Sequence, residues 1–462
     1  MLWLAVFASF AACARCAVLE VPSSDASDVF SRALPGDVIL FGRGAWVLNS
    51  VSIGSNVTLR GIGGATVLTG LLSAGPGCMI SGVRFVSGSF MGSGAAIMDS
   101  VFENCTIRIV GGLSSFANVT VMGSSSGAVY LENAGSVRIV DSNFSNNSAA
   151  YGGAIYAVGT DVTILGRSRL EHNAATNDGG AIYMASGVLK IGDDTLCMSN
   201  TADNGGCAFA VTVSVSGRAT FALNRAASGG GALSVLYFDA GEYAVFRSNA
   251  ANDGGGVCVR DYNGYVVASV AGAVQFEANA ASWRGGGLAV LLSFYDYSAD
   301  GSIGISGNVV FVGNRASLGG GLYNGIIAAY VSGNASILQN EAGDSGGGAY
   351  SYSGAVIMRG NSVIRGNRAG TGGGAMCNYC NFELDDDAGE SSNALSANMS
   401  DLPLAAITDN WATGSGGGIY GLQSGISMAG RASISRNRAS QGGGVGLWAT
   451  WGRLQAGGHS GG

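Results

Sequence analysis

A glycine run beside a basic residue is the first feature of the sequence that could carry chemistry. The stretch Phe221 to Val235 reads FALNRAASGGGALSV, with Arg225 ahead of three glycines. Such a run can cradle a phosphate, because backbone N–H groups converge on the anion where no side chain intervenes. A phosphate loop also needs a lysine that reaches the phosphates. The chain has a single lysine, Lys190, and it stands outside every glycine run, so the phosphate interpretation fails.

The glycine run belongs to a repeat, and this changes its meaning. Versions of the stretch recur eleven times, for example FSNNSAAYGGAIY from Phe144 and ISRNRASQGGGVGL from Ile434. Each version contains an asparagine with alanine two residues later, and a run of glycines begins five or six residues after the asparagine. Phe, Leu, Ile or, once, Cys197 stands three residues before it. The eleven asparagines are Asn147, Asn173, Asn200, Asn224, Asn249, Asn279, Asn314, Asn340, Asn367, Asn410 and Asn437.

The repeat predicts a solenoid, because a unit of about 25 residues cannot bury its apolar face without stacking on its neighbours. Apolar alternation before the asparagine, a short apolar strand after the glycines and a variable third piece indicate three short strands per turn. The predicted fold is all-β, a right-handed, single-stranded parallel β-helix from about residue 37 to 447. Only four prolines occur in the chain, which suits an uninterrupted parallel ladder of hydrogen bonds.

The repeated asparagine has a mechanical role in this prediction. A side-chain amide carries donors and an acceptor, so it can bond to the equivalent amide one coil above and one coil below. The eleven asparagines are therefore expected to form one structural ladder along a corner of the solenoid. The glycines are expected to shape the next corner, since they adopt backbone angles that residues with a Cβ avoid.

The motifs also resemble known families. Phe144-x-x-Asn147 followed by Gly152-Gly153-Ala154-Ile155 matches the F-x-x-N and G-G-A-I signature of the polymorphic outer membrane protein repeat, and the resemblance covers about residues 140–447. The stretch that begins DASDVFSRALPGDVILFGRG resembles the entry of pectin-lyase-like β-helices. This second resemblance implies a short helix from about Asp25 to Leu34 that caps the first coil.

The two ends of the chain suggest its organisation and location. The opening MLWLAVFASFAACARCA has the length and small-residue ending of a signal peptide, although a buried strand is the alternative. The expected parts are a signal peptide at 1–17, the cap and first coils at 18–140, the repeats at 141–447 and a Gly-rich tail at 448–462. We expect a secreted or cell-surface protein of the cell envelope or outer membrane. No segment has 18 unbroken apolar residues, and the uncapped last coil is expected to favour end-to-end self-association.

The cysteines are expected to form disulfides or to remain buried thiols. Cys78 and Cys105 are 27 residues apart, about one coil, which could place them in adjacent rungs at disulfide distance. Cys377 and Cys380 form a CxxC motif, but the mature chain has no second CxxC and the whole chain has two histidines. A zinc site is therefore disfavoured, and we expect no cofactor.

Charge excludes nucleic acid as a partner, because the chain has a net charge of −7 and no basic patch. The densest acidic group stands in the gap between two repeats, where Asp385, Asp386 and Asp387 are weak calcium candidates. The same insert contains Asn398, the best of seven candidate glycosylation sites. No residue is assigned a catalytic role.

The leading functional hypothesis is a non-catalytic, secreted or surface-displayed β-helix that adheres to an extracellular polysaccharide or a cell-surface protein. A polysaccharide lyase or glycoside hydrolase of pectin-lyase-like fold is one alternative, and a structural extracellular spacer is another. The enzyme would need acids, or acids plus an arginine, on adjoining coils, and the sequence places no such site. Aromatic residues in the variable segments could instead form an exposed binding surface, or pack in the core: Tyr237, Phe238, Tyr262, Trp283, Phe294, Tyr295 and Tyr297.

Overall fold

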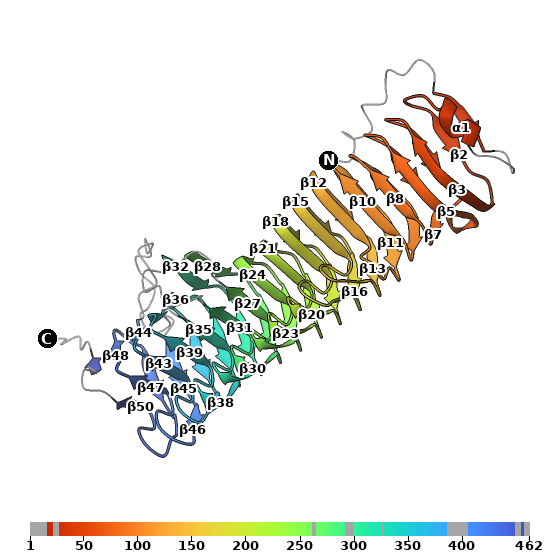
Figure 1. Ribbon diagram of the computed structural model, residues 1–462. Coiled ribbons are helices and arrows are strands. Elements are labelled where there is room, and N and C mark those ends of the chain that lie inside the picture. Colours follow the sequence, from red (N-terminus) through yellow and green to blue (C-terminus); the bar gives the residue numbers. More distant parts are fainter. Residues whose placement is uncertain are drawn as a thin grey trace, which may run out of the picture.

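The chain forms a long rod of stacked coils, with the N-terminal coils at one end and the C-terminal coils at the other (Figure 1). The structure is a computed structural model that describes residues 16–21, 27–260, 265–291, 300–325, 327–385, 405–448 and 454–456. Strands of successive coils pair in parallel, as β15 (Ile155–Leu165) pairs with β18 (Ile182–Ile191). This architecture, with one short α-helix near the N-terminus, confirms the predicted all-β parallel β-helix.

The coils differ from the prediction in having four rows of strands rather than three. The residues that follow the ladder asparagine pair with the next coil as short strands of their own, where the sequence indicated only a turn. These corner strands form a separate sheet of ten: β14 (Ser148–Ala149), β17 (Ala174–Ala175), β20 (Thr201–Asn204), β23 (Arg225–Gly229), β26 (Ala250–Asp253), β30 (Ala280–Arg284), β34 (Arg315–Leu318), β38 (Glu341–Ser345), β42 (Arg368–Ala369) and β46 (Trp411–Ala412).

The strands that precede the asparagine form a second row, whose central residue is buried in every strand except the last. They are β13 (Asn143–Ser145), β16 (Arg169–Glu171), β19 (Leu196–Met198), β22 (Thr220–Ala222), β25 (Val245–Arg247), β29 (Gln275–Glu277), β33 (Val310–Val312), β37 (Ser336–Leu338), β41 (Val363–Arg365), β45 (Ala406–Thr408) and β49 (Ser433–Ser435).

The post-glycine strands and the strands that follow them form the remaining two rows, which are continuous in the first repeats. The post-glycine strands are β12 (Val129–Val140), β15, β18, β21 (Ala208–Val215), β24 (Leu233–Ala240), β27 (Val257–Arg260), β31 (Leu288–Leu291), β35 (Leu322–Asn324), β39 (Ala349–Tyr352), β43 (Ala375–Asn378), β47 (Ile419–Leu422) and β50 (Val445–Trp448). The last row becomes separate from β28 onward: β28 (Tyr265–Val270), β32 (Asp300–Ile305), β36 (Ala328–Val331), β40 (Val356–Met358), β44 (Asn381–Leu384), β48 (Gly425–Met428) and β51 (Leu454–Ala456).

The entry coils precede the repeats and are capped by the helix α1 (Ser27–Arg32). Val29 and Phe30 of α1 are buried, and the Phe30 ring lies 5.9 Å from the Phe41 ring of the first coil. The helix thus covers apolar side chains at the open end of the core. The entry elements are β1 (Val18–Glu20), β2 (Val38–Leu40), β3 (Gly44–Ile53), β4 (Thr58–Arg60), the 3-10 helix η2 (Gly63–Ala65), β5 (Thr66–Ala74), β6 (Met79–Ser81), β7 (Arg84–Val86), β8 (Ser89–Gly92), β9 (Ala96–Glu103), β10 (Thr106–Val110) and β11 (Ser114–Met122).

All eleven repeat asparagines lie in one row and are linked by hydrogen bonds. The Nδ2 of each donates to the Oδ1 of the next at 2.9–3.0 Å. Asn279 is representative: its Nδ2 also donates to the Phe246 carbonyl, and its Oδ1 accepts a second bond from the Asn249 backbone. Both donors and both acceptor positions of this buried amide are therefore satisfied.

The core beside this ladder is a stack of aromatic rings. The rings of Phe221, Phe246, Phe276 and Phe311 are fully buried, with centroids 4.8, 4.9 and 4.5 Å apart and nearly parallel planes. Such offset stacking adds to the free energy gained from burying each ring. The residue three positions before the asparagine thus fills the same place in every coil.

The glycine corner is built for contact between coils. Gly230 has a φ of 68°, and a Cβ on Gly231 would collide with the carbonyl oxygen of Gly255 in the next coil. The N–H groups of the run are already used, since Gly231 donates to Gly254 and Ala232 to Gly256 at 3.0 and 2.9 Å. The run therefore offers no cradle to a phosphate.

The cysteine pairing differs from the expected one. Cys78 and Cys105 are separate buried thiols, because the coils near them are shorter than 27 residues and Met79, which follows Cys78, pairs with Ala96. A disulfide instead joins Cys197 to Cys207, at the phenylalanine position and the third glycine position of one repeat. A second disulfide joins the CxxC pair of residues 377 and 380. In the described residues, no helix is long and apolar enough to cross a membrane.

The ladder predicts a large loss of stability from one buried substitution. Asn279→Ala would remove the bonds that its side chain makes to the Asn249 amide and backbone and to the Asn314 Oδ1, so we expect the free energy of unfolding to fall by about 1–3 kcal/mol. The shift would be measured by denaturant unfolding followed by circular dichroism.

A matched control exists on the surface of the same rod. Asn334 also bonds to amides in both neighbouring coils, Asn308 and Asn361, but these bonds are exposed to water. Asn334→Ala should change the free energy of unfolding by about 0.5 kcal/mol or less. Equal losses in the two variants would contradict the structural role of the buried ladder.

Candidate functional site

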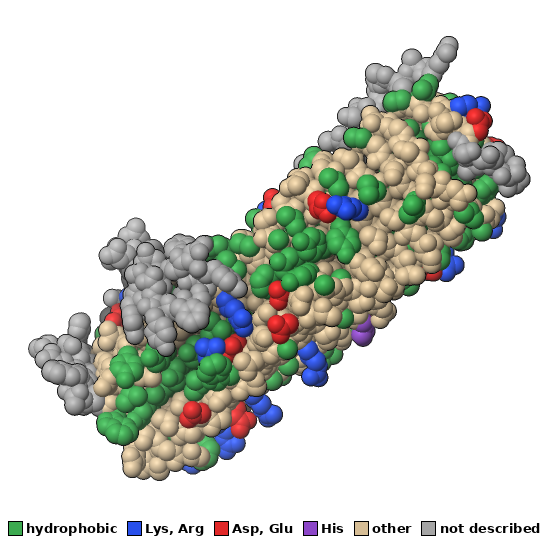
Figure 2. Space-filling view, viewed as in Figure 1, with side chains coloured by type: hydrophobic (Ala, Val, Ile, Leu, Met, Phe, Trp, Pro, Cys, Tyr) green, Lys and Arg blue, Asp and Glu red, His purple; other side chains and the backbone are tan. Residues whose placement is uncertain are grey.

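An outward-facing row of aromatic side chains runs along four post-glycine strands. Tyr130, Tyr156, Tyr183 and Phe209 occupy one register position of β12, β15, β18 and β21. Neighbouring ring centroids are 5.7, 5.4 and 5.5 Å apart, and the Tyr151 ring packs on Tyr183 at 4.9 Å. Figure 2 shows hydrophobic side chains gathered over this part of the rod. We call these five residues the aromatic row.

The orientation of the rings decides what the aromatic row can contact. The planes of Tyr156 and Tyr183 differ by 16°, and those of Tyr183 and Phe209 by 10°, so the ring faces cover one another. A partner that lies on the row would meet ring edges and phenol groups, which combine apolar contact with hydrogen bonding. Tyr151, which is 40% exposed, is tilted by 54° against Tyr183 and breaks the flatness of the row.

The same register position continues toward the C-terminus with smaller side chains and then with aromatics again. Ser234, Cys258 and Ala289 follow Phe209, and Tyr323 and Tyr350 follow them. The rings of the two tyrosines stack at 5.3 Å with planes 5° apart. Burial raises the pKa of both phenols. The face therefore carries two aromatic groups separated by three small residues.

A charged cluster lies beside the small residues. Asp253 of β26 has a side chain only 5% exposed, and Arg284 in the next coil donates to both of its oxygens at 2.8 and 2.9 Å. Arg260 approaches the same carboxylate at 4.0 Å and donates to the Cys258 sulfur at 3.4 Å. Burial raises the pKa of the Cys258 thiol, so the sulfur remains protonated and weakly nucleophilic. The arrangement is a closed ion pair with no reactive group at its centre.

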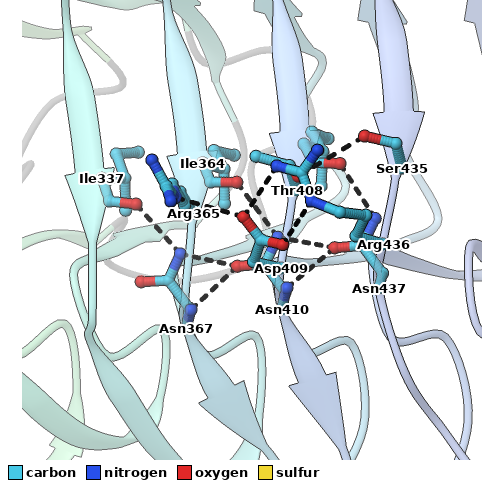
Figure 3. A network of polar contacts seen from close by, with 11 residues as sticks. Ile337, Ile364, Arg365, Asn367, Thr408, Asp409, Asn410, Ser435, Arg436 and Asn437 are labelled. Carbon is cyan, nitrogen blue, oxygen red and sulfur yellow. Dashed lines mark hydrogen bonds and ion pairs between the residues drawn. The ribbon is translucent and has the colours of Figure 1, made fainter.

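A second charged group lies outside the asparagine ladder in the last coils (Figure 3). Arg436 donates to both oxygens of Asp409 at 2.7 and 3.0 Å, and Arg365 approaches the same carboxylate at 3.2 Å. The hydrogen bonds from Arg436 are the largest cause that lowers the pKa of Asp409, to about 2. Beside this group, Arg368 lies over the Trp411 ring at 5.1 Å, and Trp411 pairs with Arg438 in the next coil.

An acid-lined hollow of about 680 Å³ at another corner is the nearest approach to the site that a polysaccharide-cleaving enzyme would need. Asp141, Asp193 and Glu242 line it, but each accepts a backbone N–H from a neighbouring coil at 2.7–2.8 Å. Glycine coils separate these acids, so successive carboxylates are two coils, about 10 Å, apart. Asp194, which follows Asp193 and also lines the hollow, is the one carboxylate near enough to another for paired catalysis, and Arg218 pairs with it at 2.7 Å.

Most of the candidate calcium, glycosylation and aromatic binding residues predicted from the sequence lie outside the described part of the chain. Asp386, Asp387 and Asn398 lie outside the described residues, as do Tyr262, Phe294, Tyr295 and Tyr297. Asp385 is described, and its backbone N–H donates to Met358 at 3.0 Å. No group of three or more His, Cys, Asp or Glu residues that could hold a metal ion occurs within the described part of the chain.

The remaining aromatic candidates separate into core and surface. Phe238 is buried at 2% exposure and packs against the Phe246 ring, so it belongs to the core and not to a binding surface. Tyr237 is half-buried. Trp283 is 48% exposed, with the Arg284 guanidinium 3.9 Å from its ring centroid.

Sequence reasoning missed the aromatic row and both charged groups, although the repeat contained their signal. Tyr156 and Tyr183 each follow the G-G-A-I motif directly, and Asp253 and Arg284 each stand immediately before a glycine triplet. Equivalent positions of the repeat become neighbours in space. Aligning every repeat position, rather than the asparagine and glycines alone, would have revealed these rows.

The Asp409 group predicts an unusual titration. We expect the Asp409 carboxyl to titrate near pH 2 and, in Arg436→Ala, to titrate closer to its ordinary value of 3.8. Because the folded-state pKa is lowered, the ion pairs stabilise the fold above about pH 4 and lose that effect as the pH falls toward 2. Carboxyl carbon shifts in an NMR pH titration measure both values, with Asp194, which Arg218 holds, as the unchanged reference. A wild-type midpoint near 3.8 would contradict the geometry.

Comparison with known proteins places one segment in a named repeat family. Residues 141–158 match the Chlamydia polymorphic membrane protein (Chlamydia_PMP) repeat, as the motif at Phe144 predicted. No curated protein sequence matches the chain. Among solved structures, the PL6 family alginate lyase AlyGC is similar with 11% identity and a TM-score of 0.28, over 93% of this chain and 78% of the lyase. The A-module of the Azotobacter vinelandii mannuronan C-5 epimerase AlgE6 has 9% identity and a TM-score of 0.17, over 94% of each chain. The chain is thus a parallel β-helix that carries a polymorphic membrane protein repeat.

Proposed function

We propose that the protein is a non-catalytic, surface-displayed rod that adheres through its aromatic row to an extracellular polysaccharide or a cell-surface protein. The observation that carries the proposal is the row itself, because aromatic side chains stacked along four successive coils remain partly open to solvent. The match of residues 141–158 to a polymorphic membrane protein repeat supports a location at the cell surface.

The length of the aromatic row favours a partner that is itself extended. Four coils at about 4.8 Å per coil span roughly 15 Å between the first and last ring. A polymer or a protein face that lies along the rod could contact every ring at once, and many weak contacts would add to a useful affinity. The low charge of the chain is consistent with apolar and hydrogen-bonded contacts in this region.

The arrangement of the charged groups supports the proposal that the protein is not an enzyme. Catalysis of glycosidic cleavage requires charged groups held within a few ångströms of one bond. Asp253 and Asp409 are each engaged by arginines, and the acids of the hollow at Asp141, Asp193 and Glu242 are engaged by backbone N–H groups. These acids therefore have structural partners already.

The aromatic row generates a binding prediction. The double variant Tyr156→Ala/Tyr183→Ala removes the two central rings, so we expect adhesion to weaken by about tenfold or more, which corresponds to about 1.4 kcal/mol. Retention would be measured by affinity electrophoresis in gels of neutral glucan, mannan and xylan, and by binding of protein-coated beads to intact cells.

A surface tyrosine outside the row serves as the control for this experiment. Tyr243 is 64% exposed and lies at the acid-lined hollow, so Tyr243→Ala should bind like the wild type. Loss of adhesion in Tyr243→Ala alone, or full adhesion of the double variant in every assay, would reject the aromatic row as the binding surface.

Catalysis is tested separately. Purified protein incubated with pectins, alginates and glucans, with and without calcium, should release neither unsaturated products nor reducing ends. Products that disappear in Asp193→Ala/Glu242→Ala, or in a variant with residues 385–387 changed to alanine, would show that the protein is a polysaccharide lyase or hydrolase.

A further inference from the structure

A second surface of the rod has the opposite character to the aromatic row, because positive charge gathers there. A groove of about 660 Å³ runs along the outside of the asparagine ladder in the last coils, over β42 and β46. The ladder residues Asn367, Asn410 and Asn437 line it, although the side-chain amides of Asn367 and Asn410 are buried in the ladder, and Gly366 contributes no side chain. Its lining includes Arg436 and Asp409, which Figure 3 shows paired.

The charge of the groove is positive although the chain is acidic. Three arginines and one carboxylate line the groove, namely Arg368, Arg436, Arg438 and Asp409, which gives its lining a net charge of plus two. Arg365 approaches Asp409 from beside the groove. Within the described part of the chain, Asp409 forms its ion pairs with Arg365 and Arg436. Within the described residues, neither Arg368 nor Arg438 forms an ion pair with a carboxylate, so both guanidinium groups are available to an outside anion.

The spacing of the two available arginines suits a repeating ligand. Arg368 and Arg438 occupy the same repeat position, directly after a ladder asparagine, and Trp411 occupies that position in the coil between them. Two coils place the arginines about 10 Å apart along the rod. Alternate anionic groups of an extended chain of linked sugar rings have a similar spacing. The Trp411 ring, which is 41% exposed, supplies an apolar surface between the two charges.

We propose that this groove binds an anionic polysaccharide, with Arg368 and Arg438 on its carboxylate or sulfate groups and Trp411 against an intervening sugar ring. Guanidinium groups bind such anions with paired, charge-assisted hydrogen bonds. Nucleic acid fits less well, because the positive stretch is three coils long and Glu341 stands in the coil before Arg368. The groove is separate from the aromatic row, so the two sites can be tested independently.

The direct test compares charged polymers with their neutral counterparts. In the Tyr156→Ala/Tyr183→Ala variant, which lacks the two central rings of the aromatic row, polygalacturonate and dextran sulfate should bind at low salt, whereas methyl-esterified polygalacturonate and dextran should not, as measured by isothermal titration calorimetry. Binding should weaken as salt is raised, because the contacts are between exposed charges. Equal binding of charged and neutral polymers, or tighter binding of single-stranded DNA than of either acidic polysaccharide, would overturn the proposal.

The arginines are tested against a matched position of the same repeat. Arg368→Ala/Arg438→Ala should weaken binding by about tenfold or more, since two charge-assisted contacts are lost. Arg225 also follows a ladder asparagine and is exposed, but its neighbour in the next coil is Ala250 and not an aromatic residue. Arg225→Ala should bind like the wild type. Equal losses in both variants would show that general positive charge, and not the groove, holds the polymer.

A variant that strengthens binding separates recognition from structure. Asp409→Asn keeps the shape of the side chain but frees the charges of Arg365 and Arg436, so the affinity for polygalacturonate should rise by about threefold at low salt. A purely structural role for Asp409 predicts unchanged or weaker binding, which would count against the proposal. Tyr156→Ala/Tyr183→Ala should leave this affinity unchanged, and circular dichroism would verify that each variant is folded.

Discussion

The rest of the rod depends on the need to satisfy buried amide groups at one corner of every coil. An asparagine side chain inside a narrow core is unfavourable unless both its donors and its acceptor find partners. Here the amides find these partners in the coils before and after them, as Asn314 does with Asn279 and Asn340. The coils are therefore held at one register with respect to each other, and every other repeat position is aligned as a consequence.

This alignment explains why few charges occur and how the existing ones are arranged. Side chains at equivalent positions stand about 4.8 Å apart, so like charges in successive coils would repel each other. Most of the described ion pairs instead join opposite charges of neighbouring coils, such as Arg84 with Glu103 and Arg108 with Glu132. The groove beside Arg368 and Arg438 departs from this rule, and an unbalanced position in an otherwise balanced pattern is a reasonable place to look for a ligand.

The sequence predicted the elements that recur and failed where coil length varies. The asparagines and glycines could be assigned because their neighbours in space are other copies of the same residue. Cys78 and Cys105 were paired by assuming a constant coil, whereas the entry coils are shorter. The disulfide between Cys197 and Cys207, by contrast, follows from the repeat positions of the two cysteines. They replace the phenylalanine and the third glycine of a repeat, and these two positions are in contact in other coils, for example at Phe276 and Gly287. The corner strands were missed because strands of two to five residues carry no recognisable period.

The hydrogen bond between Asn367 and Asn410 spans 43 residues of chain, yet at 2.9 Å it is as short as the bond between Asn200 and Asn224, which spans 24. The extra residues between these two asparagines therefore add nothing to the height of the ladder. The length of the rod is set by the number of coils, because every coil adds the same rise whatever its number of residues. Insertions could accumulate in such a molecule over evolutionary time and diversify its flanks, while the distance between its two ends stayed the same.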